Sequence, residues 1–314
     1  MKKTTILRRL LAERKGKVIV KPSAYDAFSA KIIEAAGFKV VGVSGAALTA
    51  VLLGKPDAGY LSMIEVIMMS RYIANAISLP VIADADTGYG NALNVMRTTE
   101  EFIKAGVACI HIEDQVDPKR CGMTGGKILI PIEEAVGKYK AADKVRRELD
   151  PDFVLMARTD ACGSVGGSLD EAITRANAYV EAGADMVSPD GIISEEDLVR
   201  FVKEVKAPIH FNRVGLSPKL HISRLEEIGV AIVSNPIGAI NASGTAIQRY
   251  MDEFIKRDQD FLTEFSENAK GTIGENAHSF LSFCGFSEVR KLEEMFLPIE
   301  EITKKYKKSV GYKW

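Results

Sequence analysis

Short runs of β-branched residues alternate along most of the chain with longer segments of helical period, and this alternation constrains the fold more than any other feature. It is typical of successive strand–helix units around a parallel sheet. Eight runs are predicted to be strands: Lys17–Val20, Lys39–Val43, Pro80–Ala83, Ala108–Ile112, Phe153–Ala157, Asp185–Val187, Ala207–Phe211 and Val230–Val233. They favour the α/β class and a closed (β/α)8 barrel of the TIM type. An open doubly wound sheet is the alternative, but no GxGxxG turn follows the first run, as a dinucleotide-binding fold requires.

Amphipathic segments separate these runs, and glycine follows several of them. Gly37, Gly106, Gly183 and Gly229 each stand shortly before a predicted strand, where the end of a helix needs a residue that tolerates positive φ. The predicted helices are Tyr25–Ala36, Ser62–Ile77, Leu93–Ala105, Ile132–Leu149, Leu169–Ala182 and Glu195–Val205. We therefore predict a barrel catalytic domain over residues 1–250.

Residues 251–314 keep the helical period without a further clear strand, which predicts a C-terminal helical extension. The extension contains more large apolar residues than a solvent-exposed tail usually does: Phe280, Phe283, Phe286, Met295 and Phe296. We expect it to pack on a partner subunit, or to be exchanged between subunits, in a homo-oligomer.

The charge balance argues against polyanionic partners. The chain has 41 basic and 42 acidic side chains, a net charge of −1, so it offers no global field for nucleic acid or an anionic membrane. Four scattered cysteines predict neither a disulfide framework nor a zinc ribbon and favour a reducing compartment. Charged residues interrupt the N-terminal segment, and no apolar run reaches membrane-spanning length, so we expect a cytoplasmic protein that binds small molecules.

Polar residues follow most of the predicted strands, at the end of the barrel where active sites are built. They are Ser44-Gly45, Asp84 and Asp86, the segment from His111 to Asp114, the segment from Arg158 to Asp160, Asp190, and Asn212-Arg213. Asp84, Asp86 and Glu113 offer hard oxygen ligands suited to Mg²⁺ or Mn²⁺. Alternatively, these carboxylates bind loop amides or pair with Arg158, which needs a carboxylate from the protein or the substrate if it is buried.

The segment from Gln115 to Lys127 is rich in glycine and charge, which predicts a mobile lid after the fourth strand. It contains Cys121, directly preceded by Lys119 and Arg120. Nearby positive charge is expected to favour the thiolate, the state that acid–base or nucleophilic chemistry uses. The alternative for an isolated cysteine is an inert residue.

In combination, six segments resemble the isocitrate lyase and phosphoenolpyruvate mutase superfamily, and within it the methylisocitrate lyase and 2,3-dimethylmalate lyase branch. They are VSG at residues 43–45, GKPDAG at 54–59, ADADTGYGN at 83–91, IHIEDQ at 110–115, KRCG at 119–122 and MARTDA at 156–161. The resemblance covers residues 20 to 250 and implies a magnesium-dependent carbon–carbon lyase of a 2-hydroxy dicarboxylate.

The resemblance also implies roles for individual residues. Asp84 would ligate Mg²⁺ directly, and Asp57, Asp86 and Glu113 would act through water. Cys121 would protonate the carbanion or enolate left by bond cleavage. The substrate would be bound by Ser44, Gly45, Ala46, Gly122, Arg158, Asp190 and Asn212, with Lys119, Arg158 and Cys121 as the catalytic set.

Three departures from the pattern narrow the expected substrate. Met123 stands where the lyase motif usually has histidine, Asp190 stands where glutamate is usual, and Asn241 stands where methylisocitrate lyases carry arginine. These changes favour a 2-alkylmalate over methylisocitrate. Oxaloacetate decarboxylation or phosphonopyruvate processing is the alternative activity, and a catalytically silent carboxylate-binding protein is the alternative of another class.

Overall fold

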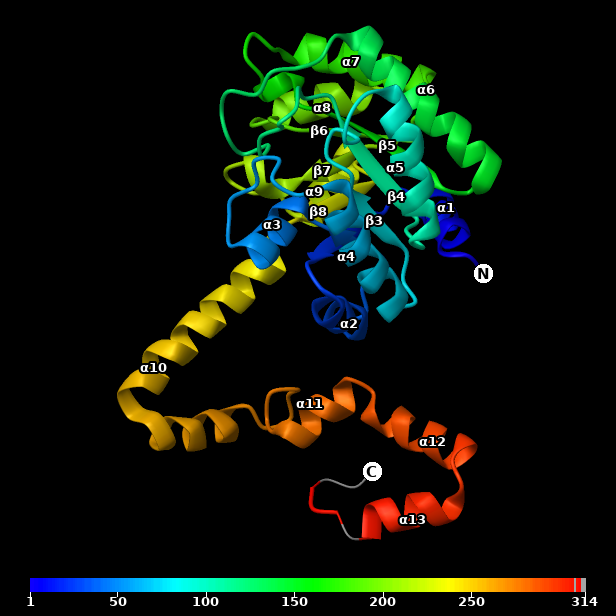
Figure 1. Cartoon of the computed structure of the whole chain (residues 1–314). Helices are drawn as coiled ribbons and strands as arrows, with labels where there is room; N and C mark the ends of the chain where they lie inside the picture. The colour runs from blue at the N-terminus through cyan, green and yellow to red at the C-terminus, as the bar shows by residue number, and fades with distance from the viewer. Residues whose placement is uncertain (308, 312–314) are drawn as a thin grey trace. The chain divides into compact units, whose positions relative to one another are not determined.

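The computed structural model describes residues 1–307 and 309–311 and contains an eight-stranded parallel barrel (Figure 1). Neighbouring strands follow the order β6-β5-β4-β3-β2-β1-β8-β7. A parallel bridge between Val187 and Ile209 joins the two ends of that order, so the sheet closes on itself. The predicted (β/α)8 barrel of the TIM type is confirmed, and the open doubly wound sheet is excluded.

The strands lie one to three residues nearer the C-terminus than most of the predicted runs. Their bounds are β1 (Ile19–Ala24), β2 (Val41–Val43), β3 (Val81–Asp84), β4 (Cys109–Glu113), β5 (Val154–Thr159), β6 (Met186–Pro189), β7 (His210–Asn212) and β8 (Ile232–Asn235). The shift is largest in β1, where Lys21 and Pro22 continue the strand past Val20 and pair with Ser234 and Asn235 of β8. Several polar residues expected in loops are therefore held by strand pairing.

The helices that cover the barrel match the predicted segments within two residues. They are α2 (Ala27–Ala35), α4 (Met63–Ala76), α5 (Ala92–Lys104), α6 (Ile132–Leu149), α7 (Leu169–Glu181) and α8 (Glu195–Glu204). Most begin at a side-chain cap: in α4, Ser62 accepts a hydrogen bond from the amide of Glu65, whose carboxylate accepts one from the amide of Ser62. Three helices in this region were not predicted, α1 (Lys3–Glu13), α3 (Gly45–Leu53) and α9 (Ile222–Ile228).

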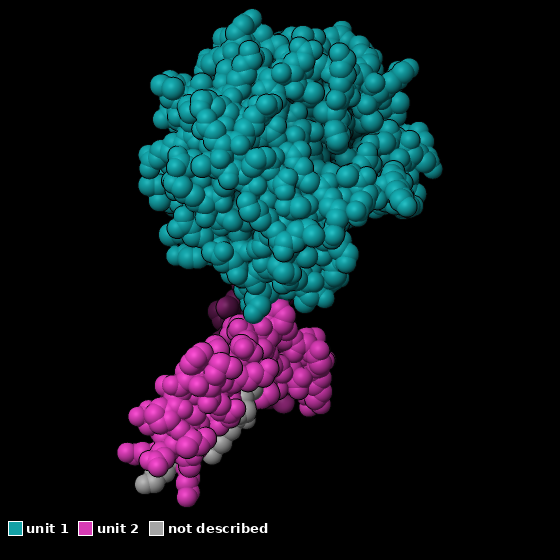
Figure 2. Space-filling model, turned by 90° about the vertical axis from the view of Figure 1, so that its right-hand side faces the viewer, with its two compact units in different colours: residues 1–242 teal, residues 243–314 magenta. Residues whose placement is uncertain are grey.

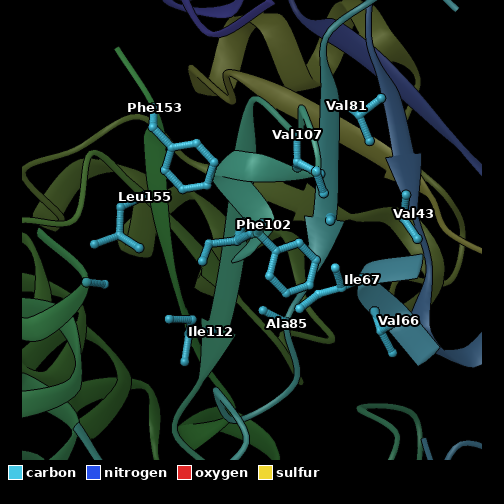
Figure 3. Packing of buried hydrophobic residues seen from close by; sticks show 14 of the residues in the cluster. Val43, Val66, Ile67, Val81, Ala85, Phe102, Val107, Ile112, Phe153 and Leu155 are labelled. Atoms are coloured by element: carbon cyan, nitrogen blue, oxygen red, sulfur yellow. The ribbon is translucent and has the colours of Figure 1, made fainter. Parts of the chain in front are cut away.

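Side chains alternate between the two faces of each strand. Outward residues pack against the helices: Val81, Ile112 and Leu155 belong to one apolar cluster with Phe102 of α5, and Figure 3 shows this cluster from close by. Inward residues near the amino ends of the strands form an apolar layer, in which Ile82, Val154 and Ile232 pack with Leu7 of α1. The opposite end of the barrel interior is polar, and it holds the candidate site.

The chain divides into two compact units, residues 1–242 and 243–314 (Figure 2). Helix α10 (Gly238–Asn268) runs through this boundary and through the predicted one at residue 250, which stays a prediction. The second unit continues with α11 (Ala277–Phe283), α12 (Phe286–Phe296) and α13 (Ile299–Lys307). Across the described residues, no helix is both long and apolar enough to cross a bilayer.

Candidate active site

A cavity of about 300 Å³ lies at the carboxyl ends of the strands. Nine of the predicted site residues line it: Ser44, Ala46, Asp57, Asp84, Cys121, Gly122, Arg158, Asp190 and Asn212. The other four, Gly45, Asp86, Lys119 and Glu113, contact that lining, as described below. Residues that are far apart in the sequence are therefore brought to one end of the barrel.

Asp84 at the end of β3 is the carboxylate that the surrounding backbone positions most firmly. Its Oδ2 accepts a hydrogen bond from the amide of Gly45 at 3.2 Å, and its Oδ1 accepts one from the amide of Asp86 at 3.1 Å. Burial opposes ionisation, but His111, Lys119 and Arg158 outweigh it and hold the pKa of Asp84 well below its ordinary value. Asp84 therefore presents an ionised carboxylate to the cavity.

Lys119 links two of the other carboxylates. Its buried Nζ lies 2.7 Å from Oδ1 of Asp57 and 2.8 Å from Oδ1 of Asp86. Asp86 has a φ of 46°, which turns the chain immediately after β3 and directs its carboxylate to this lysine. The two aspartates of the ADAD segment thus share one rim of the barrel but differ in partners.

The acidic residues fit a cation that keeps several water ligands. Oε1 of Glu113 is buried without a hydrogen-bond partner, whereas Oε2 of Glu113 and Oδ1 of Asp86 lie against the cations Arg158 and Lys119. Burial raises the pKa of Glu113 well above its ordinary value. Among the described residues, no three acidic, histidine or cysteine side chains converge closely enough to ligate one ion directly. A magnesium ion bound by one carboxylate, with others reached through water, needs no such cluster.

Arg158 at the end of β5 is surrounded by acids. Its guanidinium donates two hydrogen bonds of 2.9 Å to Asp160, and it lies 3.2 Å from Glu113 and 3.4 Å from Asp190. Burial alone would lower its pKa, but these carboxylates raise the pKa well above the ordinary value. Arg158 is thus a permanent cation whose charge is largely neutralised by the protein.

The predicted lid lies over the cavity, which Cys121, Gly122 and Met123 line. The side chain of Gln115 donates to the carbonyl of Arg120 and accepts from its amide, both at 2.9 Å, and so braces the loop. The amide of Cys121 donates to the carbonyl of Asp57 at 3.1 Å. These contacts connect the thiol-bearing turn to the acidic rim.

Lys127 fixes the far end of the lid, and the sequence interpretation assigned it no role. Its buried Nζ donates to the carbonyl of Gly122 at 2.7 Å and lies 3.2 Å from Asp160 and 3.5 Å from Asp190. The lysine therefore holds the turn after Cys121 against the ends of β5 and β6.

The expectation that neighbouring cations favour the Cys121 thiolate is wrong. Burial raises the pKa of this thiol, and the opposing effects of Lys119 and Arg158 are smaller. Arg120 precedes the thiol but is exposed to solvent. Cys121 is consequently held as a thiol, the form that donates a proton.

A second group of polar residues lies deeper in the barrel, and sequence analysis missed most of it. His210 of β7 bridges two serines of the neighbouring strands, with Nδ1 2.8 Å from the hydroxyl of Ser188 and Nε2 in contact with the hydroxyl of Ser234. His111 of β4 has Nδ1 3.6 Å from Oδ1 of Asp84. Burial lowers the pKa of His111 to about 4 and that of His210 well below its ordinary value, so both are neutral. Lys21 of β1 completes this layer.

Comparison with known proteins identifies the family. A family model described as phosphoenolpyruvate phosphomutase matches residues 7–255. The 2,3-dimethylmalate lyase of Eubacterium barkeri is 40% identical over 295 residues, which are 92% of this chain and 96% of that protein. The chain belongs to the phosphoenolpyruvate phosphomutase family. The 2-methylisocitrate lyase of Aeropyrum pernix, 39% identical over 259 residues and 81% of each chain, is another similar protein.

Solved structures of the phosphoenolpyruvate mutase and isocitrate lyase superfamily share the fold of this family member. A phosphonopyruvate hydrolase in complex with oxalate and Mg²⁺ aligns with a TM-score of 0.81 at 31% identity, covering 95% of this chain and 100% of that one. The family resemblance inferred from the six sequence segments is confirmed.

Proposed function

We propose that this protein is a magnesium-dependent carbon–carbon lyase that cleaves a 2-alkylmalate, or a closely related 2-hydroxy dicarboxylate, into a 2-oxo acid and a carboxylate. The observation that carries the proposal is that the Cys121 thiol, the Arg158 guanidinium and the Asp84 carboxylate all line one cavity of about 300 Å³. The relative from Eubacterium barkeri, named for its action on a substituted malate, supports the reaction class.

The acidic rim would hold the metal. Asp84 would be the direct ligand, since its carboxylate is ionised and faces the cavity. Asp57, Asp86 and Glu113 would act through water, with Mn²⁺ as the alternative cation. When bound, the ion would polarise the oxygens of the 2-oxo acid end and offset their negative charge. The Mg²⁺ and oxalate of the related phosphonopyruvate hydrolase complex support this assignment.

The chain's own residues would bind and orient the substrate. Ser44 caps α3, and Gly45 and Ala46 follow it at the N-terminus of that helix, where backbone N–H groups and the helix dipole favour a carboxylate. Because the amide of Gly45 donates to Asp84, the amide of Ala46 would bind the substrate carboxylate, with Gly45 beside it. Arg158 would bind the oxygen-bearing end of the substrate. The remaining predicted contacts come from Gly122, Asp190 and Asn212 at the other side of the cavity.

Cleavage requires a proton at the carbon that leaves. A carboxylate at the cavity would accept the proton of the 2-hydroxyl. The oxygen lone pair then forms the carbonyl of the 2-oxo acid, and the electrons of the C2–C3 bond pass to C3 as an enolate of the departing carboxylate. The thiol of Cys121 then donates its proton to C3. Lys119 keeps the acidic rim and the lid together through Asp57 and Asp86, and the closed lid excludes water.

The wall of the cavity contributed by the lid, by Phe211 of β7 and by the loops after β6, β7 and β8 favours an alkyl substituent over a third carboxylate. Its apolar residues are Met123, Ile192, Ile193, Phe211, Val214, Pro236 and Ile237. Among the described lining residues, no lysine or arginine belongs to this wall. A third carboxylate placed there would lose its hydration without gaining a cation, whereas a methyl or ethyl group gains burial.

Product analysis over a panel of substituted malates tests the proposal. With Mg²⁺ present, mass spectrometry should detect a 2-oxo acid, and chelation should abolish its formation. Cys121→Ser should lower turnover by about 10²- to 10⁴-fold, the usual value of a positioned general acid, while still binding oxalate with Mg²⁺. Equal turnover by the two proteins would remove the thiol from this role. Carbon dioxide released from oxaloacetate by both would indicate a decarboxylase, and oxalate binding without any turnover would indicate a silent binding protein.

The proposal includes a homo-oligomer in the cytoplasm. In the second unit, Met295 is 71% exposed and Phe296 is 73% exposed, which is typical of a surface that another copy of the chain covers. Cys109, Cys121 and Cys162 form no disulfide, as in proteins of a reducing compartment.

A further inference from the structure

Lys21 is a buried lysine that the mechanism above does not use. It lies on β1 between Ile19 and Ser23, with only 3% of its surface exposed, and it lines the cavity together with Ser23, Ser44 and Asp84. A lysine at this depth in a barrel strand is unusual, because burying an ammonium removes its hydration.

The neighbouring strand is built to make room for this side chain. A β-carbon added to Gly42 of β2 would lie 3.3 Å from Nζ of Lys21 and 2.5 Å from the hydroxyl of Ser23. The ammonium therefore occupies the space beside Gly42, two residues before Ser44 in the same inward-facing row. It lies beneath the turn formed by Ser44, Gly45 and Ala46.

Of the lysine and arginine side chains that line the cavity in the described part of the chain, Lys21 is the one that forms no ion pair. Arg158, Lys119 and Lys127 each lie within 4 Å of two or more carboxylates. Within residues 1–307 and 309–311, neither a carboxylate nor another acceptor is recorded within bonding distance of Nζ of Lys21. Its nearest titratable neighbours are Cys109, Asp84, His111 and His210.

The ammonium is nonetheless charged at neutral pH. Burial lowers the pKa of Lys21 to about 8, which leaves most of the side chain protonated at pH 7. The two histidines are neutral, so they neither repel nor neutralise it strongly. A buried, unpaired charge destabilises the fold, and an anionic ligand entering the cavity would offset that cost.

We propose that Lys21 is a substrate-binding residue, whose ammonium contacts the carboxylate of the 2-oxo acid end of the substrate from beneath the Ser44–Ala46 turn. The inference rests on the proposed function, because it assigns a further cation to the same pocket. It gives the substrate a cation that the protein does not already neutralise, in contrast to Arg158.

Oxalate binding tests the inference without requiring turnover. Titration calorimetry with oxalate and Mg²⁺ compares the wild type with Lys21→Met, which keeps the shape of the stem but removes the charge. Loss of one charge-assisted hydrogen bond should weaken binding about 10- to 100-fold. The melting temperature of ligand-free Lys21→Met should rise by about 2–4 °C, because a buried unpaired cation has been removed.

Lys3→Met is the matched control. Lys3 is a partly buried lysine outside the cavity, and its ammonium donates to the carbonyls of Ala74 and Ile77. Removing these bonds should lower the melting temperature and leave oxalate binding unchanged. A higher melting temperature for Lys21→Met and a lower one for Lys3→Met would distinguish an unpaired lysine that serves function from a hydrogen-bonded lysine that stabilises the fold.

Lys21→Gln covers the case in which the methionine variant does not fold, since its shorter polar side chain fits the same space. If a folded Lys21 variant binds oxalate with the affinity of the wild type, Lys21 does not bind the substrate, and the proposed function is unaffected. A wild type that binds no oxalate and cleaves no substituted malate would overturn both. Weaker binding by the variants, with the control unaffected, would support Lys21.

Discussion

Gly122 is the position at which the closed lid can be perturbed by a single atom. A β-carbon added there would lie 2.3 Å from Oδ1 of Asp190 and 2.5 Å from Cγ and Oδ2 of the same side chain. Asp190 has little freedom to move, because its carboxylate lies 3.4 Å from Arg158 and 3.5 Å from Lys127. In Gly122→Ala, the lid therefore has to lift from the end of β6.

The cost of this clash sets the expected effect. Inserting one carbon into a packed site costs about 1–3 kcal/mol. The added carbon clashes with Asp190 only when the lid is closed, so it destabilises the closed conformation alone. The ratio of closed to open lid should therefore drop about 5- to 150-fold. The value of kcat/KM for a substituted malate should fall by the same factor, because the Cys121 proton donor is in place only when the lid is closed.

Two measurements check this prediction, and one of them is independent of the substrate. Steady-state kinetics give kcat/KM, and limited trypsin digestion reports cleavage after the exposed Arg120 of the lid. Gly122→Ala should be cut faster than the wild type with oxalate and Mg²⁺ present. Gly125→Ala is the matched control in the same loop, since no atom lies within 4 Å of its added β-carbon. This account of the lid would be refuted if Gly122→Ala and the wild type had the same kcat/KM and the same rate of digestion. It would also be refuted if Gly125→Ala changed both quantities as much as Gly122→Ala does.

Two further predictions concern stability and assembly. Asp114→Asn should destabilise the protein by about 3–5 kcal/mol in urea unfolding, because it leaves the buried guanidinium of Arg175, 3.4 Å from the carboxylate, without its counter-charge. The carboxylate also accepts hydrogen bonds from Tyr179 at 2.7 Å, Thr159 at 2.8 Å and the amide of Asp160 at 3.0 Å. A loss below about 1 kcal/mol would show that the asparagine amide replaces these interactions. Sedimentation should give a mass of two or more chains that falls when Met295 and Phe296 are both changed to serine, whereas a wild-type mass of one chain at all concentrations would refute the proposed homo-oligomer.

The alternation of strands and helices was predictable because burial on both faces makes each barrel strand a continuous apolar run. The exact ends of the strands were not predictable, because each strand was predicted from its run of apolar residues. Such a run ends where the inward-facing residues become polar. Main-chain pairing continues past that point, as Glu113 opposite Arg158 shows. In β1, Lys21-Pro22 resembled a break, although the backbone there pairs with β8.

The rim of the site was predictable for the same positional reason. Polar residues that follow an apolar strand fall at one end of a barrel, and so Asp84, Glu113 and Arg158 could be placed together from the sequence. The protonation state of Cys121 was not predictable from its sequence neighbours, because adjacent charges in the sequence say nothing about burial. Lys119 turns to Asp57 and Asp86, and Arg120 turns to solvent, so the desolvated thiol remains protonated.

Most of the deeper polar layer escaped sequence analysis because it lies within the strands. Side chains alternate between the two faces of a strand, and Lys21, His111 and His210 occupy inward-facing positions. In a barrel such positions usually hold apolar side chains. Next to them, the layer formed by Ile82, Val154 and Ile232 with Leu7 of α1 is fully apolar and closes the amino end of the barrel. The barrel interior is thus divided by depth: one half stabilises the fold by burial, and the other half contains buried polar groups, among them an ammonium whose cost a bound anion would offset. The proposed contact of Lys21 with the substrate carboxylate would explain why a lysine is kept there although it destabilises the empty protein.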